Sequence, residues 1–404
     1  SDVGGRLHVA RSRNDILATH DRLRARDIGL NVLDALNAAR EVALSRAAAY
    51  ADVVMPGYTH LQSAQPISYG HYLSAVAQAM ARDAGRIEQA IVNMDASPLG
   101  AGALAGTAFP IQREETARLL GFSGCVENSL DAVASRDFAW ELMSAMTIAS
   151  LTWGRIAQDF YVWATPEFGL IEFPDSVAGT SSIMPQKKNP VVVEYLKGKT
   201  SHLIGLLTAA MSAVKGTHFT HSGDGNRESM RSFWESADEC LRCLVLFKLV
   251  IDSARPVEAT MLHKARTDFS TATDLADALV RESDLSFREA HHVVGAVVRQ
   301  ALDAGLPASD ITAEMVNAAA TEQTGRPICL SEQSVRLCLD PAYSLESRSA
   351  KGGPAPSLVV LRIAQQRDEL HKAQERAMRT RQMVADSRTR LQCELTELAD
   401  LSAD

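Results

Sequence analysis

Five long stretches of the chain carry the residue pattern of helices and contain few residues that interrupt one. They run over residues 15–48, 67–96, 136–164, 190–213 and 227–253, and each is at least about twice the ~11–12 residues of an average globular helix. Alanine and leucine are abundant, and no segment keeps the two-residue alternation of a half-buried strand for long. The sequence therefore predicts an all-α fold built on a bundle of long helices.

The long helices are apolar over much of their circumference, which is typical of bundles that bury more than one face of each helix. Some of these faces are expected to meet other subunits. After residue 262 the predicted helices become shorter. We therefore expect a central bundle domain over residues 11–262 and a smaller helical domain over residues 263–404, whose charged, heptad-like tail forms a solvated helix.

Charge and composition exclude several classes of function. The net charge of −8 and the lack of a basic cluster interleaved with aromatics argue against a nucleic-acid partner. The sequence shows no signal peptide and no apolar stretch long enough to cross a membrane. The six cysteines lack zinc-type spacing, and Cys240 and Cys243 lie in a predicted buried helix, so we interpret this C-x-x-C pair as structural. These features predict a cytoplasmic protein without a membrane partner.

One polar loop, GTSSIMPQKKNP (179–190), leads directly into an apolar helix. Asn189 and Pro190 suit the N-cap and the first helical position. A helix N-terminus carries partial positive charge, and Lys187 and Lys188 add to it, so the loop favours a carboxylate or a developing oxyanion. A serine in this field can act as a base or a nucleophile. The alternative is a polar turn with surface lysines.

Two further loops carry groups suited to anions and proton transfer. RSRND (11–15) places Arg13, a carboxylate-binding fork, and Asn14, a two-way amide, at the start of the first long helix. YTHLQ (58–62) places Thr59 beside His60, and histidine is the usual proton-transfer residue near neutral pH. A surface ion pair for Arg13 and a structural role for His60 are the ordinary alternatives. The residues alone indicate an anion-binding helical enzyme and leave its reaction open.

In several stretches that follow one another in the family order, the chain resembles the aspartase/fumarase superfamily, and in particular its argininosuccinate lyase branch. They are GGRLHVARSRND (4–15), MPGYTHLQSAQP (55–66), PLGAGALAGTAFPIQRE (98–114), ENSLDAVASRDF (127–138), SSIMPQKKNP (181–190), TATDLADALVRE (271–282), FREAHHVVG (287–295) and GGPAP (352–356). Enzymes of this superfamily remove a proton next to one carboxylate and expel a nitrogen or oxygen group from the neighbouring carbon, and most release fumarate.

The resemblance implies a role for each loop. Ser181 would be the general base, and His60, paired with Glu194, would be the acid or relay to the departing amine. The remaining matching residues would bind substrate. Lys187 and Asn189 would stabilise the negative charge of the aci-carboxylate. The succinyl carboxylates would be bound by Arg13, Asn14 and Thr59. Ser182 and Met184 would shape the loop or make peripheral contacts.

The resemblance also implies an assembly. Members of the family are homotetramers in which the long helices of four subunits form a shared bundle, and each active site draws on three chains. No cofactor and no metal is implied, and the adjacent His291 and His292 would point in different directions on a helix. In the family an N-terminal domain precedes the first matching stretch, so residues 1–10 would be its remnant.

The chain departs from the branch pattern where the amine end of the substrate would bind. In HSGDGNRES (221–229), His221, Asn226 and Ser229 stand where the branch usually has Tyr, Gln and Lys, and Arg227 is an addition. Losing the lysine removes a charge partner for the distal carboxylate of argininosuccinate. We therefore expect His221, Asn226 and Arg227 to bind a different amine portion.

These residues predict a carbon–nitrogen lyase that releases fumarate from an N-substituted L-aspartate through an aci-carboxylate intermediate. The first expectation for the substrate is an aminopolycarboxylate such as ethylenediamine-N,N'-disuccinate (EDDS), which one lyase of this branch cleaves. The first alternative is cleavage of argininosuccinate to arginine and fumarate. The second is an inactive structural relative resembling the lens crystallins of this branch, against which the joint presence of Ser181, His60, Lys187 and Asn189 argues.

Overall fold

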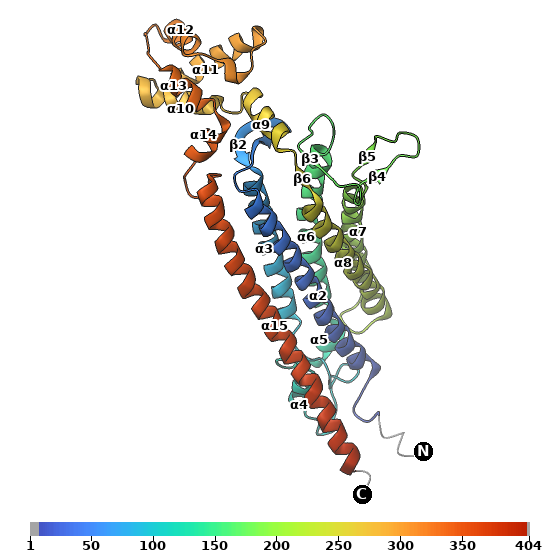
Figure 1. The fold of residues 1–404 in the computed structure, drawn as a ribbon. Coiled ribbons are helices and arrows are strands. Elements are labelled where there is room, and N and C mark those ends of the chain that lie inside the picture. The colour runs from blue at the N-terminus through green and yellow to red at the C-terminus, as the bar shows by residue number, and fades with distance from the viewer. Residues whose placement is uncertain (1–7, 402–404) are drawn as a thin grey trace.

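The computed structural model describes residues 8–401, and in this part of the chain six long helices run side by side along one axis (Figure 1). They are α2 (Arg13–Ala49), α3 (Tyr69–Asn93), α6 (Asp137–Trp163), α7 (Val191–Val214), α8 (Ser229–Ser253) and α15 (Pro356–Leu401). The first five lie where the sequence predicts them, with ends shifted by a few residues. The predicted all-α fold is confirmed.

One apolar core runs along the bundle and explains why its helices stay together. Large buried side chains such as Trp153, Phe160 and Phe247 are less than 2% exposed, and small alanines between them allow the helices to approach. Cys240 and Cys243 are fully buried in α8, as expected. Removing this much apolar surface from water is the main source of stability in such a bundle.

A second, smaller core lies beyond one end of the bundle, drawn as the upper end in Figure 1. It joins α10 (Ala272–Ser283), α11 (Phe287–Asp303), α12 (Ala313–Thr324) and α13 (Glu332–Cys338), with α14 (Pro341–Ser347) and the short helix η2 (Ala308–Asp310) beside them. The helix α9 (Glu258–Thr267) leads into this unit from the bundle. Its core residues lie between Leu275 and Leu339.

The last helix, α15, returns from the smaller unit and runs back along α2 and α3 (Figure 1). Leu370 and Ala377 are buried in the bundle core, and Arg381 and Arg388 form ion pairs with Asp34 and Asp27 of α2. The expected tail helix therefore exists, but the expectation that it is solvated was wrong for the side that faces the bundle.

The domain boundaries expected at residues 11 and 263 stay predictions. Because α15 packs on the bundle, we propose that residues 356–401 be counted with it. The expected N-terminal remnant lies mostly outside the described residues, which begin at residue 8.

Short strands cap the upper end, and short helices close the lower end. The hairpin of β1 (Val54–Thr59) and β2 (Gln62–Ser68) lies in a segment that was expected to be a loop. The other strands are pairs of two residues each: β3 (Ile171–Glu172) with β6 (Arg255–Pro256), and β4 (Gly179–Thr180) with β5 (Lys188–Asn189). At the lower end, α4 (Arg113–Leu119) packs against α15 and α5 (Ser129–Ala134) packs against α2 (Figure 1).

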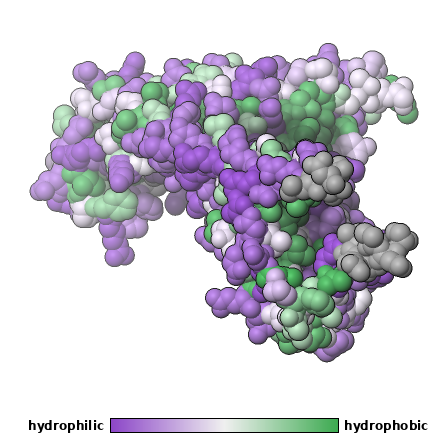
Figure 2. All heavy atoms as spheres, turned by 90° about the horizontal axis from the view of Figure 1, so that it is seen from below, coloured by the Kyte–Doolittle hydropathy of each residue, from purple (hydrophilic) through white to green (hydrophobic). Residues whose placement is uncertain are grey.

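Seen from the lower end, the surface is mostly hydrophilic with separate hydrophobic patches (Figure 2). Exposed apolar residues in the segments between helices there include Leu104, Phe109 and Phe219, which are 44%, 57% and 70% exposed. None of the helices described is both long enough and apolar enough to span a membrane.

Two glycines of α3 provide a matched test of how closely the helices pack. A Cβ at Gly70 would lie 2.4 Å from the carbonyl oxygen of Ala47, whereas a Cβ at Gly85 would meet nothing within 4 Å. We expect Gly70→Ala to lower the free energy of unfolding by about 1–3 kcal/mol through overpacking. Gly85→Ala should raise it by up to about 1 kcal/mol through helix propensity. Urea unfolding at one protein concentration measures both, and equal effects would contradict the packing described here.

Candidate active site

The predicted site begins at the lower end, where a buried carboxylate organises the start of α2. Ser12 and Asp15 form a capping box, in which the Asp15 side chain accepts the N–H of Ser12. The other Asp15 oxygen accepts the N–H groups of Gly100 and Gly102, at 3.1 and 3.0 Å. Asp15 is fully buried, so these bonds satisfy a charge that would otherwise be costly. The start of α2 is thereby tied to the loop of residues 97–106.

This arrangement leaves Arg13 and Asn14 facing a cleft of about 590 Å³ between α2 and the glycine loop. Asn14 donates its Nδ2–H to the carbonyl of Ala103 at 3.0 Å, which leaves its Oδ1 as a free acceptor in the described part of the chain. The loop depends on glycine at Gly102, whose φ is +59° and where a Cβ would lie 2.7 Å from the Gly106 oxygen. Arg13 is exposed at the rim.

The segment 221–229 also lies at the lower end, between α7 and α8. Residues Asp224–Glu228 form a π-helix, a distortion that is frequent at functional sites. Asn226 is 7% exposed and donates to the carbonyl of Val133 at 3.1 Å and to Nδ1 of His221 at 3.0 Å. With its Nδ1 accepting, His221 carries its proton on Nε2 in the neutral form.

A buried arginine, Arg136, shares a hydrogen-bond acceptor with this segment. Arg136, 1% exposed, donates from Nε to Asp21 at 2.9 Å and from Nη1 to the same Val133 carbonyl that Asn226 binds. Burial lowers the pKa of His221, and the charges of Arg136 and Arg227 lower it further. The lower end therefore presents a neutral histidine beside an exposed Arg227.

The two remaining predicted groups lie at the upper end. Thr59 and His60 form the tip of the β1–β2 hairpin and are exposed, and His60 has a φ of +56°. In a non-glycine residue this left-handed conformation is uncommon and occurs often at functional sites.

The serine loop, residues 181–187, projects from the β4–β5 pair in front of α7. Ser181 Oγ accepts the N–H groups of Ile183 and Met184, at 3.3 and 3.0 Å. Bonds of this kind stabilise the deprotonated form of a hydroxyl. Ser182 and Lys187 are exposed, and Ile183 is 86% exposed, which leaves the loop uncovered in the single chain.

The loop does end at a helix N-terminus, but the predicted cap is one residue off. Pro190, not Asn189, holds the cap position of α7, and no side chain there makes a capping bond. Asn189 instead lies in β5 opposite Gly179. The backbone pairing of the loop base takes the place of the expected side-chain cap. The carboxylate of Glu194, in the first turn of α7, accepts from the Tyr161 hydroxyl at 3.3 Å rather than from His60.

One chain keeps the two groups of predicted residues apart. Arg13, Asn14 and the segment 221–229 lie at the lower end, and His60 and the serine loop lie at the upper end (Figure 1). The 37 residues of α2 separate them, about 55 Å at 1.5 Å per residue. Within residues 8–401 of a single chain, these groups do not form a common site.

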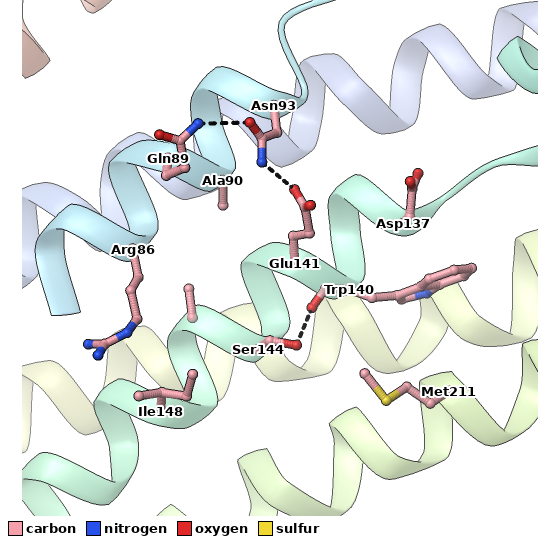
Figure 3. A pocket seen from close by; sticks show the side chains of 11 residues that line it. Arg86, Gln89, Ala90, Asn93, Asp137, Trp140, Glu141, Ser144, Ile148 and Met211 are labelled. Atoms are coloured by element: carbon pink, nitrogen blue, oxygen red, sulfur yellow. Dashed lines mark hydrogen bonds between the residues drawn. The ribbon is translucent and has the colours of Figure 1, made fainter. Parts of the chain in front are cut away.

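A surface groove of about 450 Å³ lies between α3, α6 and α7, and none of the predicted site residues lines it (Figure 3). Apolar side chains including Ile148 and Met211 line it, and Asn93 bridges Gln89 and Glu141 at one edge, with bonds of 2.8 and 2.9 Å. The groove holds none of the predicted catalytic residues, and it exposes apolar surface on the outside of the bundle.

Sequence reasoning missed two residues that organise the lower end. Asp15 follows Ser12 at the spacing of a capping box, so that signal was present in the sequence. Arg136 carries no such signal, because its partner Asp21 lies 115 residues away.

Comparison with known proteins agrees with the fold. Residues 1–205 match the family described as Lyase, and residues 269–346 match the family described as Argininosuccinate lyase C-terminal. Argininosuccinate lyase 1 of Shouchella clausii is 41% identical over 90% of this chain and 73% of its own length. Argininosuccinate lyase of Methanospirillum hungatei is 38% identical over 98% of this chain and 78% of its own.

Solved structures give the same result. EDDS lyase in complex with formate superposes with a TM-score of 0.92 at 33% identity, over 98% of this chain and 79% of that one. A class II fumarase from Schistosoma mansoni, 17% identical with a TM-score of 0.69, shares the fold alone. Fold and relatives together define a carbon–nitrogen lyase that releases fumarate. The chain belongs to the argininosuccinate lyase branch of the aspartase/fumarase superfamily.

The lowered pKa of His221 gives a pH prediction. The unfolded chain binds the proton near the ordinary pKa of about 6.5, before the folded protein does. The stability contributed by neutral His221 is therefore complete above this pH and is lost as the pH falls through the lower, folded pKa. The quantity to follow is the unfolding free energy of the unchanged protein minus that of His221→Gln. We expect this difference to decrease as the pH is lowered from about 6.5. Because His221 is only half-buried, the slope should stay below the single-group limit of about 1.4 kcal/mol per pH unit.

Urea titrations at several pH values and one protein concentration measure this difference. It should be flat above about pH 7.5, where both states are neutral. A difference that stayed flat down to about pH 5 would show that His221 does not titrate differently in the two states.

Proposed function

We propose that this lyase cleaves argininosuccinate to arginine and fumarate. The observation that carries the proposal is the similarity to enzymes named argininosuccinate lyase, at 37–41% identity over about nine tenths of the chain. The match to the C-terminal family of the same enzyme supports it independently. The comparisons therefore favour argininosuccinate over the aminopolycarboxylate that the segment 221–229 suggested first.

Ser181 is the general base in this proposal. The N–H groups of Ile183 and Met184 point at its Oγ and offset part of the cost of forming an alkoxide. The alkoxide takes a proton from the succinyl carbon next to one carboxylate, and the charge moves onto that carboxylate. Lys187 and Asn189, from the same loop, stabilise charge that appears only during the reaction.

His60 supplies a proton to the nitrogen that leaves, and Glu194 orients it. Within one chain Glu194 accepts a hydrogen bond from Tyr161 and not from His60, so in this proposal Glu194 orients the His60 of another subunit. We propose a homotetramer in which Arg13, Asn14 and Thr59 bind the succinyl carboxylates from neighbouring chains, with Ser182 and Met184 at the edge of the loop. The separation of the two groups along α2 and the apolar groove of Figure 3 support this assembly.

EDDS or a similar aminopolycarboxylate is the second candidate substrate. The residues of the segment 221–229, at the lower end of the bundle, favour it. Ser229 stands where the branch has a lysine, and it is fully buried and donates its hydroxyl to the Gly225 carbonyl. Asn226 uses both amide hydrogens within the chain. Arg227 and the Nε2–H of His221 remain as donors, a pair suited to a second carboxylate. The solved EDDS lyase has the same fold at 33% identity.

Purified protein incubated with each substrate separates the two candidates. We expect fumarate, followed by its ultraviolet absorbance, to form from argininosuccinate with the higher kcat/KM. A higher kcat/KM for EDDS would show that the second candidate is the preferred substrate. Release of fumarate from neither substrate would refute both.

Replacing the proposed base tests the mechanism. Ser181→Ala should lower kcat by about 10²–10⁴-fold, the usual contribution of general acid–base catalysis. Ser309→Ala, at an exposed position of the smaller unit, is the matched control and should keep the activity of the unchanged protein. Full turnover by Ser181→Ala would remove Ser181 from the mechanism.

The same variant tests the shared site. Arg13→Ala should also be inactive, and subunits of the two variants that are unfolded and refolded together should regain part of the activity. Recovery is expected because some sites then receive an intact Arg13 and an intact Ser181 from different chains. Mixtures as inactive as their parents would contradict a site shared between subunits.

A further inference from the structure

The hairpin that presents His60 ends in a turn that its own residues do not favour. Thr59 pairs with Gln62, and the two residues between them, His60 and Leu61, have φ values of 56° and 59°. Two successive positive φ values define a type I′ turn, for which Asn-Gly is the preferred sequence. A strained turn of this kind persists only where the surrounding structure holds it.

The bundle holds the base of the hairpin. The register of the two strands shifts between Pro56 and Tyr58, and a Cβ at Gly57 would lie 2.7 Å from the Gln65 oxygen. Bulges of this kind redirect a strand and are frequent near active sites. The Tyr58 ring packs against Phe168 of the bundle, with ring centroids 5.6 Å apart. These contacts stop two residues before the turn.

The smaller helical unit holds the second strand just beyond the turn. Ser63 donates its hydroxyl to Asp268 Oδ2 at 2.8 Å, and Gln65 donates to Thr273 Oγ1 at 3.4 Å. Both partners come from more than two hundred residues later in the chain, at the junction of α9 and α10. The Ser63 bond is the shorter one and has a charged acceptor, so it is the stronger of the two.

Hydrogen bonds within the smaller unit hold Thr273, the acceptor of the Gln65 bond. Arg348 donates to Thr273 at 3.4 Å and to the Asp274 carboxylate at 2.9 Å. Asp274 is 7% exposed and also accepts the hydroxyl of Ser344 at 2.7 Å. Thr273 is thus held by bonds within the smaller unit, and Asp268 lies at the C-cap of α9, where its backbone N–H donates to the carbonyl of Lys264.

We propose that Asp268 is a positioning residue, which acts through Ser63 to hold the strained turn and so places His60 for proton transfer. The inference rests on the role given to His60 in the proposed function. It assigns the smaller helical unit a part in catalysis without any contact with the substrate. Because His60 acts in the chemical step, the larger effect should fall on kcat, with a smaller one on KM through the neighbouring Thr59.

The test uses Asp268→Ala in the full-length chain, with fumarate release and amide hydrogen exchange as separate readouts. We expect kcat to fall about tenfold, the effect of losing one hydrogen bond to a charged group. Exchange in residues 54–68 should become faster. Asp268→Asn keeps an acceptor for Ser63 and should restore most of kcat. Asp303→Ala, an exposed aspartate on α11, should change neither readout.

A second background shows whether Asp268 acts through His60. In His60→Gln, Asp268→Ala should cause no further loss, because the group that it positions is gone. An equal loss in both backgrounds would overturn the proposal, as would unchanged exchange in residues 54–68. Faster exchange with unchanged kcat would also overturn it, while leaving the lyase activity in place. Hydrogen exchange needs no substrate. It therefore shows whether the Ser63–Asp268 bond holds the hairpin even if the proposed function is wrong.

Discussion

The packing of long helices around one apolar core determines where chemistry can occur in this protein. Along α6 and α8, the buried positions recur through the whole helix and are mostly apolar. Polar loops and unpaired backbone groups therefore collect at the two ends. The same length that makes the core large also separates Ser181, the proposed base, from Arg13 and Asn14 by about 55 Å in one chain. Packing thus makes assembly a condition of the proposed activity.

Three arginines are buried near the lower end of the bundle, where nearby groups offset their charges. The protein has a net charge of −8, yet Arg22, Arg26 and Arg136 are each at most 6% exposed near the start of the bundle. Burial lowers the pKa of all three, and each guanidinium is compensated locally. Arg136 pairs with Asp21, and the other two lie over the rings of Phe138 and Phe122. Because these charges are met within the chain, the exposed Arg13 and Arg227 remain the proposed partners of the substrate carboxylates.

The sequence predicts the long helices well because their periodicity and length are local properties. The serine loop and its position before α7 were predictable for the same reason. The β1–β2 hairpin was not, because its prolines read as a loop and its turn residues are His60 and Leu61 rather than Asn-Gly. The π-helix at Asp224–Glu228 and the contact of Asp21 with Arg136 depend on tertiary packing. Neither leaves a pattern in neighbouring residues.

The return of α15 has a consequence for how the smaller unit can move. The smaller unit, residues 258–347, lies between α8 and α15 in the chain. It is therefore an insertion that is connected to the bundle at two points. A unit attached once can rotate freely about its linker, whereas one attached twice is limited to rocking about the line between its attachments. The hairpin with His60 lies beside one of these attachments, at α9. Any rocking of the smaller unit would therefore also move the hairpin tip that carries His60.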